Sequence, residues 1–301
     1  MLLCTLQTAL LRKLATLLVL LFFTAASSFT SATVYSDARV TTQPMTAPEM
    51  SKVNSTLVFG VVPQQSAKKL ARTWGPVIRL LGQKSGLDIK FATAPDIPTF
   101  EKRLANHEYD IAYMNPYHYV VYSQTSGYSV IAKQTDKFIR GIVVVPKNSP
   151  IQTLQDLSGE TIAYPAPLAF AATLIPTATL VSQNINTERS FVKSHDSVYL
   201  SVSKGFFVAG GGVMRTLRSA PQQVQDKLRI LWQSEPYTPH AIATSPKLNN
   251  SHKKLIQSHL VSIEDPSLLH GIAFKGFSVA DDAQWDSIRN LDIDAVIKPT
   301  Q

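Results

Sequence analysis

The chain has 301 residues, 45% of them hydrophobic and 17% charged, which is enough to bury one large core or two smaller ones. Lys and Arg outnumber Asp and Glu by 29 to 21, a formal net charge of +8, without a run of five or more basic residues. This composition excludes collagen, a coiled coil and a disordered acidic chain, and we expect no nucleic-acid-binding groove.

The N-terminal segment has the charged, apolar, small order of a secretory signal peptide. Arg12 and Lys13 precede the uncharged apolar stretch 14–23, and small residues follow in TAASSFTSA. The apolar stretch is about half of the ~20 residues that span a bilayer, so a retained anchor is the weaker interpretation. We therefore predict a cleaved signal peptide over 1–32 and a periplasmic protein.

The mature chain then has no cysteine, because the only one, Cys4, lies in the leader. It can form no disulfide and no thiolate metal site. Residues 33–55 are polar, with prolines at Pro44 and Pro48. We expect them to be a flexible lead-in and expect ordered structure from Thr56 onward.

Short apolar runs alternate with helical patterns in the rest of the chain. The runs expected to be strands are 57–62, 88–93, 109–114, 129–134, 141–146, 161–164, 190–194, 206–210 and 227–234. The helices are expected at 66–81, 98–106, 115–124, 168–183 and 195–204, from about 213, and at 251–259, 266–271 and 281–289. This alternation is typical of α/β layers with mostly parallel sheets.

Two such series predict two lobes, joined by extended crossings at 138–145 and 231–243. We expect the first lobe over 56–140, the second lobe over 141–237 and a return to the first lobe over 238–301. In such folds ligands bind beyond the carboxyl ends of strands and at helix N-termini, where unpaired N–H groups face an anion.

Five stretches, by their order and spacing, are similar to one known family. They are LVFGVVP with WGPVIRLLGQKSG (57–86), YDIAYMNPYHYV (109–120), SPIQTLQDLSGETIAY (149–164), HDSVYLSVSKGFFVAGGG (195–212) and LRILWQSEPYTPHAIA (228–243). Together they resemble the periplasmic phosphate/phosphite/phosphonate-binding proteins (PhnD-like), the solute receptors of ABC importers. The resemblance covers residues 56–270.

This resemblance implies a two-lobed periplasmic binding protein fold of type II, with mostly parallel sheets flanked by helices and a hinge between the lobes. It implies a monomer without a cofactor that closes on a small anion, an oxyanion or a phosphonate, and delivers it to the membrane permease of an ABC importer. The alternative is a sensor component whose liganded form docks on a membrane histidine kinase or diguanylate cyclase.

The sequence does not predict an enzyme. It has no G-x-S-x-G and no H-E-x-x-H motif, and its seven His are dispersed without a metal-ligand cluster. Gly210–Gly212 lack the Lys and Ser/Thr of a phosphate loop, so we expect a tight turn after a strand there. A third alternative, a transferase on the same scaffold, would need a catalytic carboxylate or nucleophile in the cleft.

The family holds its anion with a Ser-Thr-Ser-type run that follows a proline at a helix N-terminus. The matching positions in this chain, 167–171, carry no hydroxyl. We expect the backbone N–H groups of Ala169, Phe170 and Ala171 to bind the anion without side-chain help. Alternatively, Phe170 and Leu168 pack on an apolar group of an organic ligand.

The remaining candidate residues are polar. The resemblance places His195 at a helix start, where its ring N–H and the helix N–H groups can donate to an anion. Tyr113, Asn115 and Tyr117 come where a strand meets a helix, over the expected cleft. Arg140 lies at the expected hinge, and its guanidinium matches oxyanion geometry. The alternatives are a helix-capping His, packed tyrosines and a solvated Arg.

Overall fold

The computed structural model describes residues 56–291 and 293. The expected signal peptide at 1–32 and the lead-in at 33–55 lie outside the described residues. Within the described part of the chain, no helix combines the length and the apolar character that crossing a bilayer requires.

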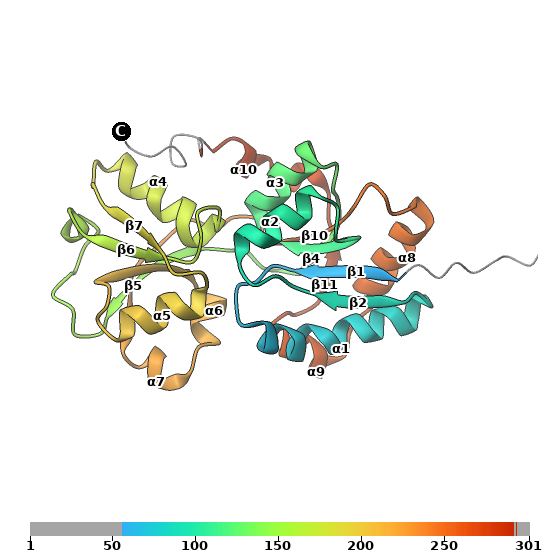
Figure 1. The fold of residues 1–301 in the computed structure, drawn as a ribbon, viewed down its shortest axis with the longest axis horizontal. Coiled ribbons are helices and arrows are strands. Elements are labelled where there is room, and N and C mark those ends of the chain that lie inside the picture. The colour runs from blue at the N-terminus through green and yellow to red at the C-terminus, as the bar shows by residue number, and fades with distance from the viewer. Residues whose placement is uncertain (1–55, 292, 294–301) are drawn as a thin grey trace, which may run out of the picture. The chain divides into compact units, whose positions relative to one another are not determined.

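A six-stranded sheet forms the centre of the first lobe (Figure 1). In pairing order, its strands are β11 (Phe277–Val279), β4 (Ser129–Gln134), β10 (Ala241–Thr244), β3 (Ile111–Met114), β1 (Leu57–Val61) and β2 (Ile89–Ala92). Strands β1, β2 and β3 run parallel, whereas β10 is antiparallel to β3 and β4, and β11 is antiparallel to β4. Val61 of β1 pairs with Tyr113 of β3, so the carboxyl ends of these strands lie together.

Helices cover both faces of this sheet (Figure 1). They are α1 (Ala67–Ser85), α2 (Ile97–Ala105), α3 (Pro116–Thr125), α8 (Asn250–Val261), α9 (Pro266–Gly271), the 3₁₀ helix Asp282–Trp285 and α10 (Asp286–Arg289). Helix α1 packs with α8 and α9, and α3 packs with α2 and α10 on the other face. Leu70, Trp74, Val77, Ile78 and Leu81 of α1 are buried, so the apolar spacing seen in the sequence faces the core.

A five-stranded sheet forms the centre of the second lobe. In pairing order, its strands are β7 (Glu188–Phe191), β6 (Thr161–Tyr164), β8 (Ala209–Val213), β5 (Gly141–Pro146) and β9 (Leu228–Gln233). Its helices are the 3₁₀ helix Gln155–Leu157, a π-helix at Phe170–Leu174 that continues into α4 (Ile175–Ser182), α5 (His195–Ser203), α6 (Met214–Arg218) and α7 (Gln222–Gln225). Strand β6 is parallel to β7 and β8, whereas β5 is antiparallel to β8 and β9.

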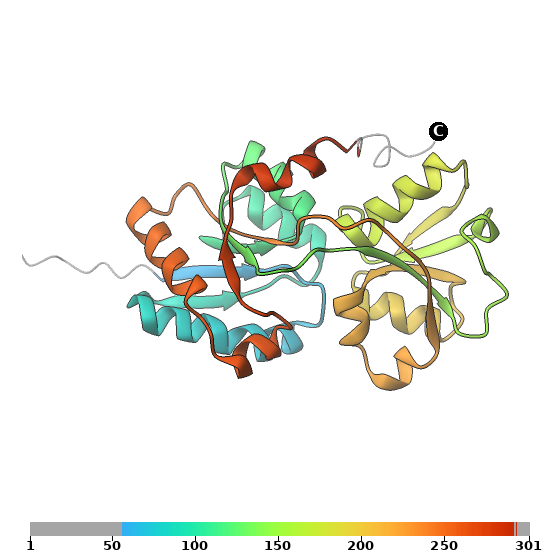
Figure 2. The ribbon, with the colours of Figure 1, turned by 180° about the vertical axis from the view of Figure 1, so that it is seen from behind.

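Two extended segments connect the sheets, one from β4 to β5 and one from β9 to β10 (Figure 2). They touch at Ile139 and Tyr237, whose backbone N–H groups each donate to the other's carbonyl at 2.9 Å. The expected pair of α/β layers joined by two crossings is therefore present. The sheets are mixed rather than mostly parallel, because every pairing of β4, β5, β9 and β10 is antiparallel.

Gly210–Gly212 lie inside strand β8 and do not form the expected tight turn after a strand. A Cβ on Gly211 would overlap the carbonyl oxygen of Ala172, and a Cβ on Gly212 would overlap the hydroxyl of Tyr199. The π-helix and α5 thus approach the sheet so closely that only glycine fits between them.

Two further strands differ from expectation by a few residues. The strands expected at 190–194 and 206–210 are β7 and β8, which begin at Glu188 and Ala209. The aromatic residues that suggested the expected positions are largely exposed, with Phe191 at 42% and Phe206 at 72%. These aromatic side chains suggested buried strands, but they lie at the surface, and the strand boundaries predicted from them were therefore wrong. Strand β11 was not predicted, and β10 was expected only as part of the returning crossing.

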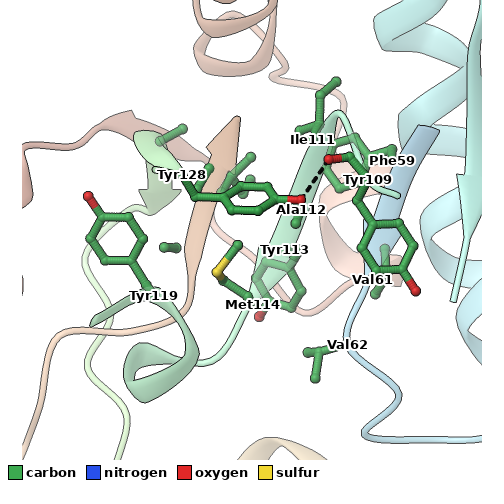
Figure 3. Packing of buried hydrophobic residues seen from close by; sticks show 14 of the residues in the cluster. Phe59, Val61, Val62, Tyr109, Ile111, Ala112, Tyr113, Met114, Tyr119 and Tyr128 are labelled. Atoms are coloured by element: carbon green, nitrogen blue, oxygen red, sulfur yellow. Dashed lines mark hydrogen bonds between the residues drawn. The ribbon is translucent and has the colours of Figure 1, made fainter. Parts of the chain in front are cut away.

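Figure 3 shows the buried core of the first lobe around β1 and β3. The rings of Tyr113 and Trp74 lie 4.5 Å apart between centroids, and the rings of Phe59 and Trp74 lie 6.0 Å apart. The hydroxyl of Tyr128 donates to the carbonyl of Tyr109 at 2.8 Å. This packing fixes the strand ends from which the candidate site is built.

Candidate ligand-binding site

Four helices begin shortly after a strand ends, and each begins at a polar capping residue. The caps are Ser66 for α1, Asp96 for α2, Asn115 for α3 and Ser194 for α5. In each case the side-chain oxygen accepts a hydrogen bond from the backbone N–H three residues later. The remaining free N–H groups of the first turn and the positive end of the helix dipole are therefore available at these points.

Residues of both lobes and of the crossings surround a small space, which we call the enclosed site. Its volume is about 10 Å³, on the order of one water molecule. It is lined by Val62, Gln64, Ile97, Asn115, Ile139, Ala169, Phe170, Ala171, Ala172, His195, Val213 and His240. Five residues predicted from the sequence meet there: Asn115, Ala169, Phe170, Ala171 and His195.

Asn115 connects the two lobes. Its side-chain oxygen accepts from the N–H of His118 at 2.8 Å, which caps α3. Its side-chain nitrogen donates to the carbonyl of Leu168 in the second lobe at 3.0 Å. Both ends of a buried amide are thus hydrogen-bonded, and the amide joins the start of α3 to the segment before the π-helix.

Phe170 fills the position at which the resembled family carries hydroxyls. Its ring is buried and contacts the ring of Tyr237 edge-on, with centroids 5.3 Å apart. The nearby hydroxyl of Thr173 is bonded to the carbonyl of Ala166 at 2.8 Å. The segment therefore offers an apolar wall and the backbone N–H groups of a helix start to the enclosed site.

His195 begins α5 and is only 2% exposed. Its Nδ1 lies 3.4 Å from the hydroxyl of Thr216, which in turn lies 2.6 Å from the hydroxyl of Tyr199. Burial, and next the positive charge of Arg215, lower the pKa of His195 to about 3. The imidazole is therefore neutral at neutral pH and holds a single N–H to donate.

Arg215 was not predicted from the sequence, and it lies next to the enclosed site without lining it. It follows β8 in α6, is half-buried, and donates to the side-chain oxygen of Gln64 from the first lobe. None of the salt bridges among the described residues includes it. Its charge acts on the pKa values of His195 and His240. Its signal in the sequence was a basic residue just after a buried strand.

His240 was also not predicted, and it comes from the returning crossing. It is 4% exposed, and its ring stacks on Tyr113 with centroids 4.9 Å apart. Its Nε2 is buried without a hydrogen-bond partner among the described residues. Burial, then Arg215, His118 and His195, hold the pKa of His240 well below its ordinary value, so the ring is neutral.

A second and larger space, which we call the hinge cavity, has a volume of about 670 Å³. It is lined by Tyr113, Gln134, Lys137, Phe138, Ile139, Arg140, Val213, Met214, Arg215, Arg218, Ser219, Ile230, Gln233, Pro239, His240, His270 and Ala273. It shares Ile139, Val213 and His240 with the enclosed site. The two spaces therefore share part of their walls.

The remaining three predicted residues do not line the enclosed site. Tyr113 and Arg140 line the hinge cavity, and Tyr117 on α3 lines neither space. The exposed Arg140 donates to the carbonyl of Ser234 at 2.8 Å and so links the two crossings. Among the described residues, no group of three or more His, Cys, Asp or Glu side chains could hold a metal ion.

The chain matches a family model over most of its length. The model is described as "ABC transporter, phosphonate, periplasmic substrate-binding protein" and matches residues 59–285. A curated relative, the phosphate-import protein PhnD of Mycolicibacterium smegmatis, is 20% identical over 278 residues, which cover 78% of this chain and 84% of the relative.

Solved structures show a similar fold. A binding protein component of an ABC phosphonate transporter from Pseudomonas aeruginosa superposes with a TM-score of 0.73 at 17% identity, covering 82% of this chain and 90% of that one. PhnD1 of Prochlorococcus marinus, in complex with methylphosphonate, superposes with a TM-score of 0.71 at 17% identity, covering 78% of this chain and 96% of that one. At this identity the likeness establishes the two-lobed fold of type II periplasmic binding proteins.

Proposed function

Because the chain belongs to the phosphonate family of periplasmic substrate-binding proteins of ABC transporters, we propose that it captures a small phosphonate-type oxyanion between its two lobes for an importer. The permease of that importer is the partner that the family implies. The family assignment does not favour the alternative of a sensor component. The ligand, the residues that hold it and the monomeric state are the parts of this proposal that experiment has to test.

The observation that carries the proposal is the position of Arg215. A guanidinium without a carboxylate partner among the described residues lies beside two neutral imidazoles, His195 and His240. Its one hydrogen-bond partner in the other lobe is the neutral amide of Gln64. A phosphonate oxygen is a far stronger acceptor for a guanidinium than an amide oxygen, so an anion can replace this contact.

The other donors complete the proposed site. His195 supplies one ring N–H, Asn115 supplies its amide N–H₂, and the start of the π-helix supplies the backbone N–H groups of Ala169–Ala171. Phe170 faces the carbon substituent of a phosphonate, a group that phosphate lacks. A phosphonate is thus preferred to phosphate by contact with an apolar wall.

Tyr113, Tyr117 and Arg140 act at a distance in this proposal. Tyr113 supports the ring of His240 by stacking, and Arg140 braces the crossings through Ser234. Tyr117 belongs to the wall of α3. The enclosed site is much smaller than a phosphonate, so the lobes part when the ligand enters and close around it by contacts with both.

Calorimetric titration of the exported protein with methylphosphonate, phosphite, phosphate and sulfate tests the proposal. We expect methylphosphonate to bind. We expect Arg215→Gln to weaken its binding by about 10- to 100-fold, because the loss of one hydrogen bond to a charged group changes the affinity by about this factor. Arg72→Gln removes the same charge from an exposed position of α1 and is the control. If none of the four anions binds, or if Arg215→Gln binds as tightly as the control, the proposal is wrong.

A further inference from the structure

The hinge cavity is larger than a small oxyanion requires. Its volume of about 670 Å³ lies within the roughly 300–1,000 Å³ typical of pockets that take drug-sized ligands. The enclosed site, by contrast, has room for about one water. The two spaces therefore suit ligands of different size, although they meet at Ile139, Val213 and His240.

The charges that line the hinge cavity are all of one sign. Lys137, Arg140, Arg215 and Arg218 contribute four cationic side chains, and none of the described residues that line it is an Asp or Glu. No described carboxylate forms a salt bridge with any of the four. Clustered cations in a concave surface repel one another and concentrate anions, so an anionic occupant relieves an electrostatic cost.

The same cavity presents large apolar side chains to solvent. Phe138 is 64% exposed and Ile230 is 40% exposed, and both line it together with Met214. Phe138 comes from the outgoing crossing, whereas Ile230 comes from β9 and Met214 from α6. Apolar area beside a cluster of cations favours a ligand that has both an anionic group and an apolar body.

One residue that lines the cavity has a buried polar atom without a hydrogen-bond partner among the described residues. Nε2 of His240 is buried and unbonded among the described residues, while the ring itself is 4% exposed and stacked on Tyr113. A buried nitrogen without a hydrogen bond is destabilising, and a hydrogen bond with a ligand would remove that cost. His240 is one of the residues that line both spaces.

We infer that the hinge cavity is a second binding site, for an organic phosphate or phosphonate whose body is apolar or aromatic. The anionic group binds Arg215 and Arg218, the body lies against Phe138 and Ile230, and a polar atom of the ligand pairs with His240. This site goes beyond the small-oxyanion site proposed above, from which it differs in Phe138, Ile230 and Arg218.

Titration with three probes tests the inference on the exported protein. The probes are 1-naphthyl phosphate, which has charge and an aromatic body, inorganic tripolyphosphate, which has charge alone, and methylphosphonate. We expect Phe138→Ser to weaken the binding of 1-naphthyl phosphate by about fivefold, because apolar contact with the ring is lost. The binding of tripolyphosphate should not change. We expect Arg218→Gln to weaken the binding of 1-naphthyl phosphate by about tenfold, because a charged hydrogen bond is lost.

The controls separate this inference from the proposed function. Phe138 and Arg218 lie outside the enclosed site and, unlike Arg215 with its bond to Gln64, form no side-chain hydrogen bond to a described residue that lines it. Methylphosphonate binding should therefore be the same in both variants as in the unaltered chain. Arg72→Gln should leave all three probes unaffected, and unchanged melting temperatures should show that every variant folds. Failure of 1-naphthyl phosphate to bind at millimolar concentration, or binding that neither variant weakens, overturns the inference whatever methylphosphonate does.

Discussion

At the scale of single residues, the candidate site combines one permanent cation with neutral polar groups. Arg215 supplies the charge, and burial keeps His195 and His240 neutral beside it. Had either imidazole been protonated, it would repel the guanidinium in a poorly solvated place. None of the described residues that line the two spaces is an Asp or Glu that would compete with an anion for Arg215.

The buried His195 should make the stability of the protein depend on pH. Its pKa is about 3 in the folded chain and near 6.5 when unfolded, so between these values the unfolded state binds one proton more. Stability is therefore fully present above pH 6.5 and is lost as the pH falls toward 3. Between pH 7.5 and 4.5 we expect His195 to account for a loss on the order of 2–3 kcal/mol.

Urea unfolding of the unaltered chain and of His195→Gln at these two pH values measures this effect. The variant should lose less stability between pH 7.5 and 4.5, because it has no proton to bind at this position. His270→Gln replaces an exposed histidine of α9 and should behave as the unaltered chain does. An equal loss in His195→Gln and the unaltered chain would show that His195 is not buried as described.

At the scale of secondary structure elements, close backbone approach holds the second lobe's side of the site. The hydroxyl of Tyr199 in α5 donates to the carbonyl of Val213 at 3.1 Å and accepts from its N–H at 3.0 Å. The π-helix lies against β8 at Gly211. The starts of α5, α6 and the π-helix are thus fixed by one strand that has almost no side chains.

Adding one methyl group to this strand should be costly. In Gly211→Ala the new Cβ overlaps the carbonyl oxygen of Ala172, a backbone atom that cannot rotate away. We expect a loss of about 3 kcal/mol or more in the free energy of unfolding. Gly271→Ala, where nothing lies within 4 Å of the new Cβ, should change stability by less than about 1 kcal/mol. Similar unfolding midpoints for the two variants would contradict the packing described for β8.

The contact between α3 and the segment before the π-helix can be tested by a single-atom exchange. Asn115→Asp keeps the oxygen that caps α3 but replaces the nitrogen that donates to Leu168. We expect methylphosphonate to bind at least about tenfold more weakly, because a donor is lost and a negative charge is added. Asn249→Asp makes the same exchange at the cap of α8, outside both spaces, and should have no effect on binding. Equal affinities of the two variants would remove Asn115 from the site.

At the scale of the whole described chain, two α/β lobes meet around the strand ends. Hydrogen bonds between the lobes include those from Asn115 to Leu168, from Arg215 to Gln64, and from Lys69 of α1 to the carbonyl of Ser219, the residue after α6. The family assignment and the two-lobed type II fold predicted from the sequence are confirmed. The family to which the chain belongs consists of periplasmic proteins, whereas the cleavage of a signal peptide remains a prediction.

Much of this fold could be predicted because burial leaves a periodic trace in the sequence. The spacing of Leu70, Trp74, Val77 and Ile78 identified α1 correctly. The run at Gly210–Gly212 was misinterpreted, because a strand packed by backbone alone has no apolar side chains to reveal it. The close approach of the π-helix and α5 to this strand depends on segments that are distant in the sequence. It therefore cannot be predicted from the residues around the glycines.

The site was predictable where a strong local signal marked it. Asn115 and His195 lie at helix starts. In both places the sequence shows an apolar strand, then a polar capping residue, then apolar residues at helical spacing. Arg215 was missed although a helix was expected from about 213, because the local sequence does not show which basic residue of α6 faces the first lobe. His240 was missed because it lies in an extended crossing, and only the folded chain brings it beside Tyr113 and Arg215.

The most direct measurement of the central claim is a crystal structure of the protein with methylphosphonate. The account predicts that the phosphonate oxygens lie within hydrogen-bonding distance of the Arg215 guanidinium and the His195 ring, and that groups of the first lobe, Asn115 among them, contact the same anion. Methylphosphonate bound elsewhere, with Arg215 still bonded to Gln64, would contradict it.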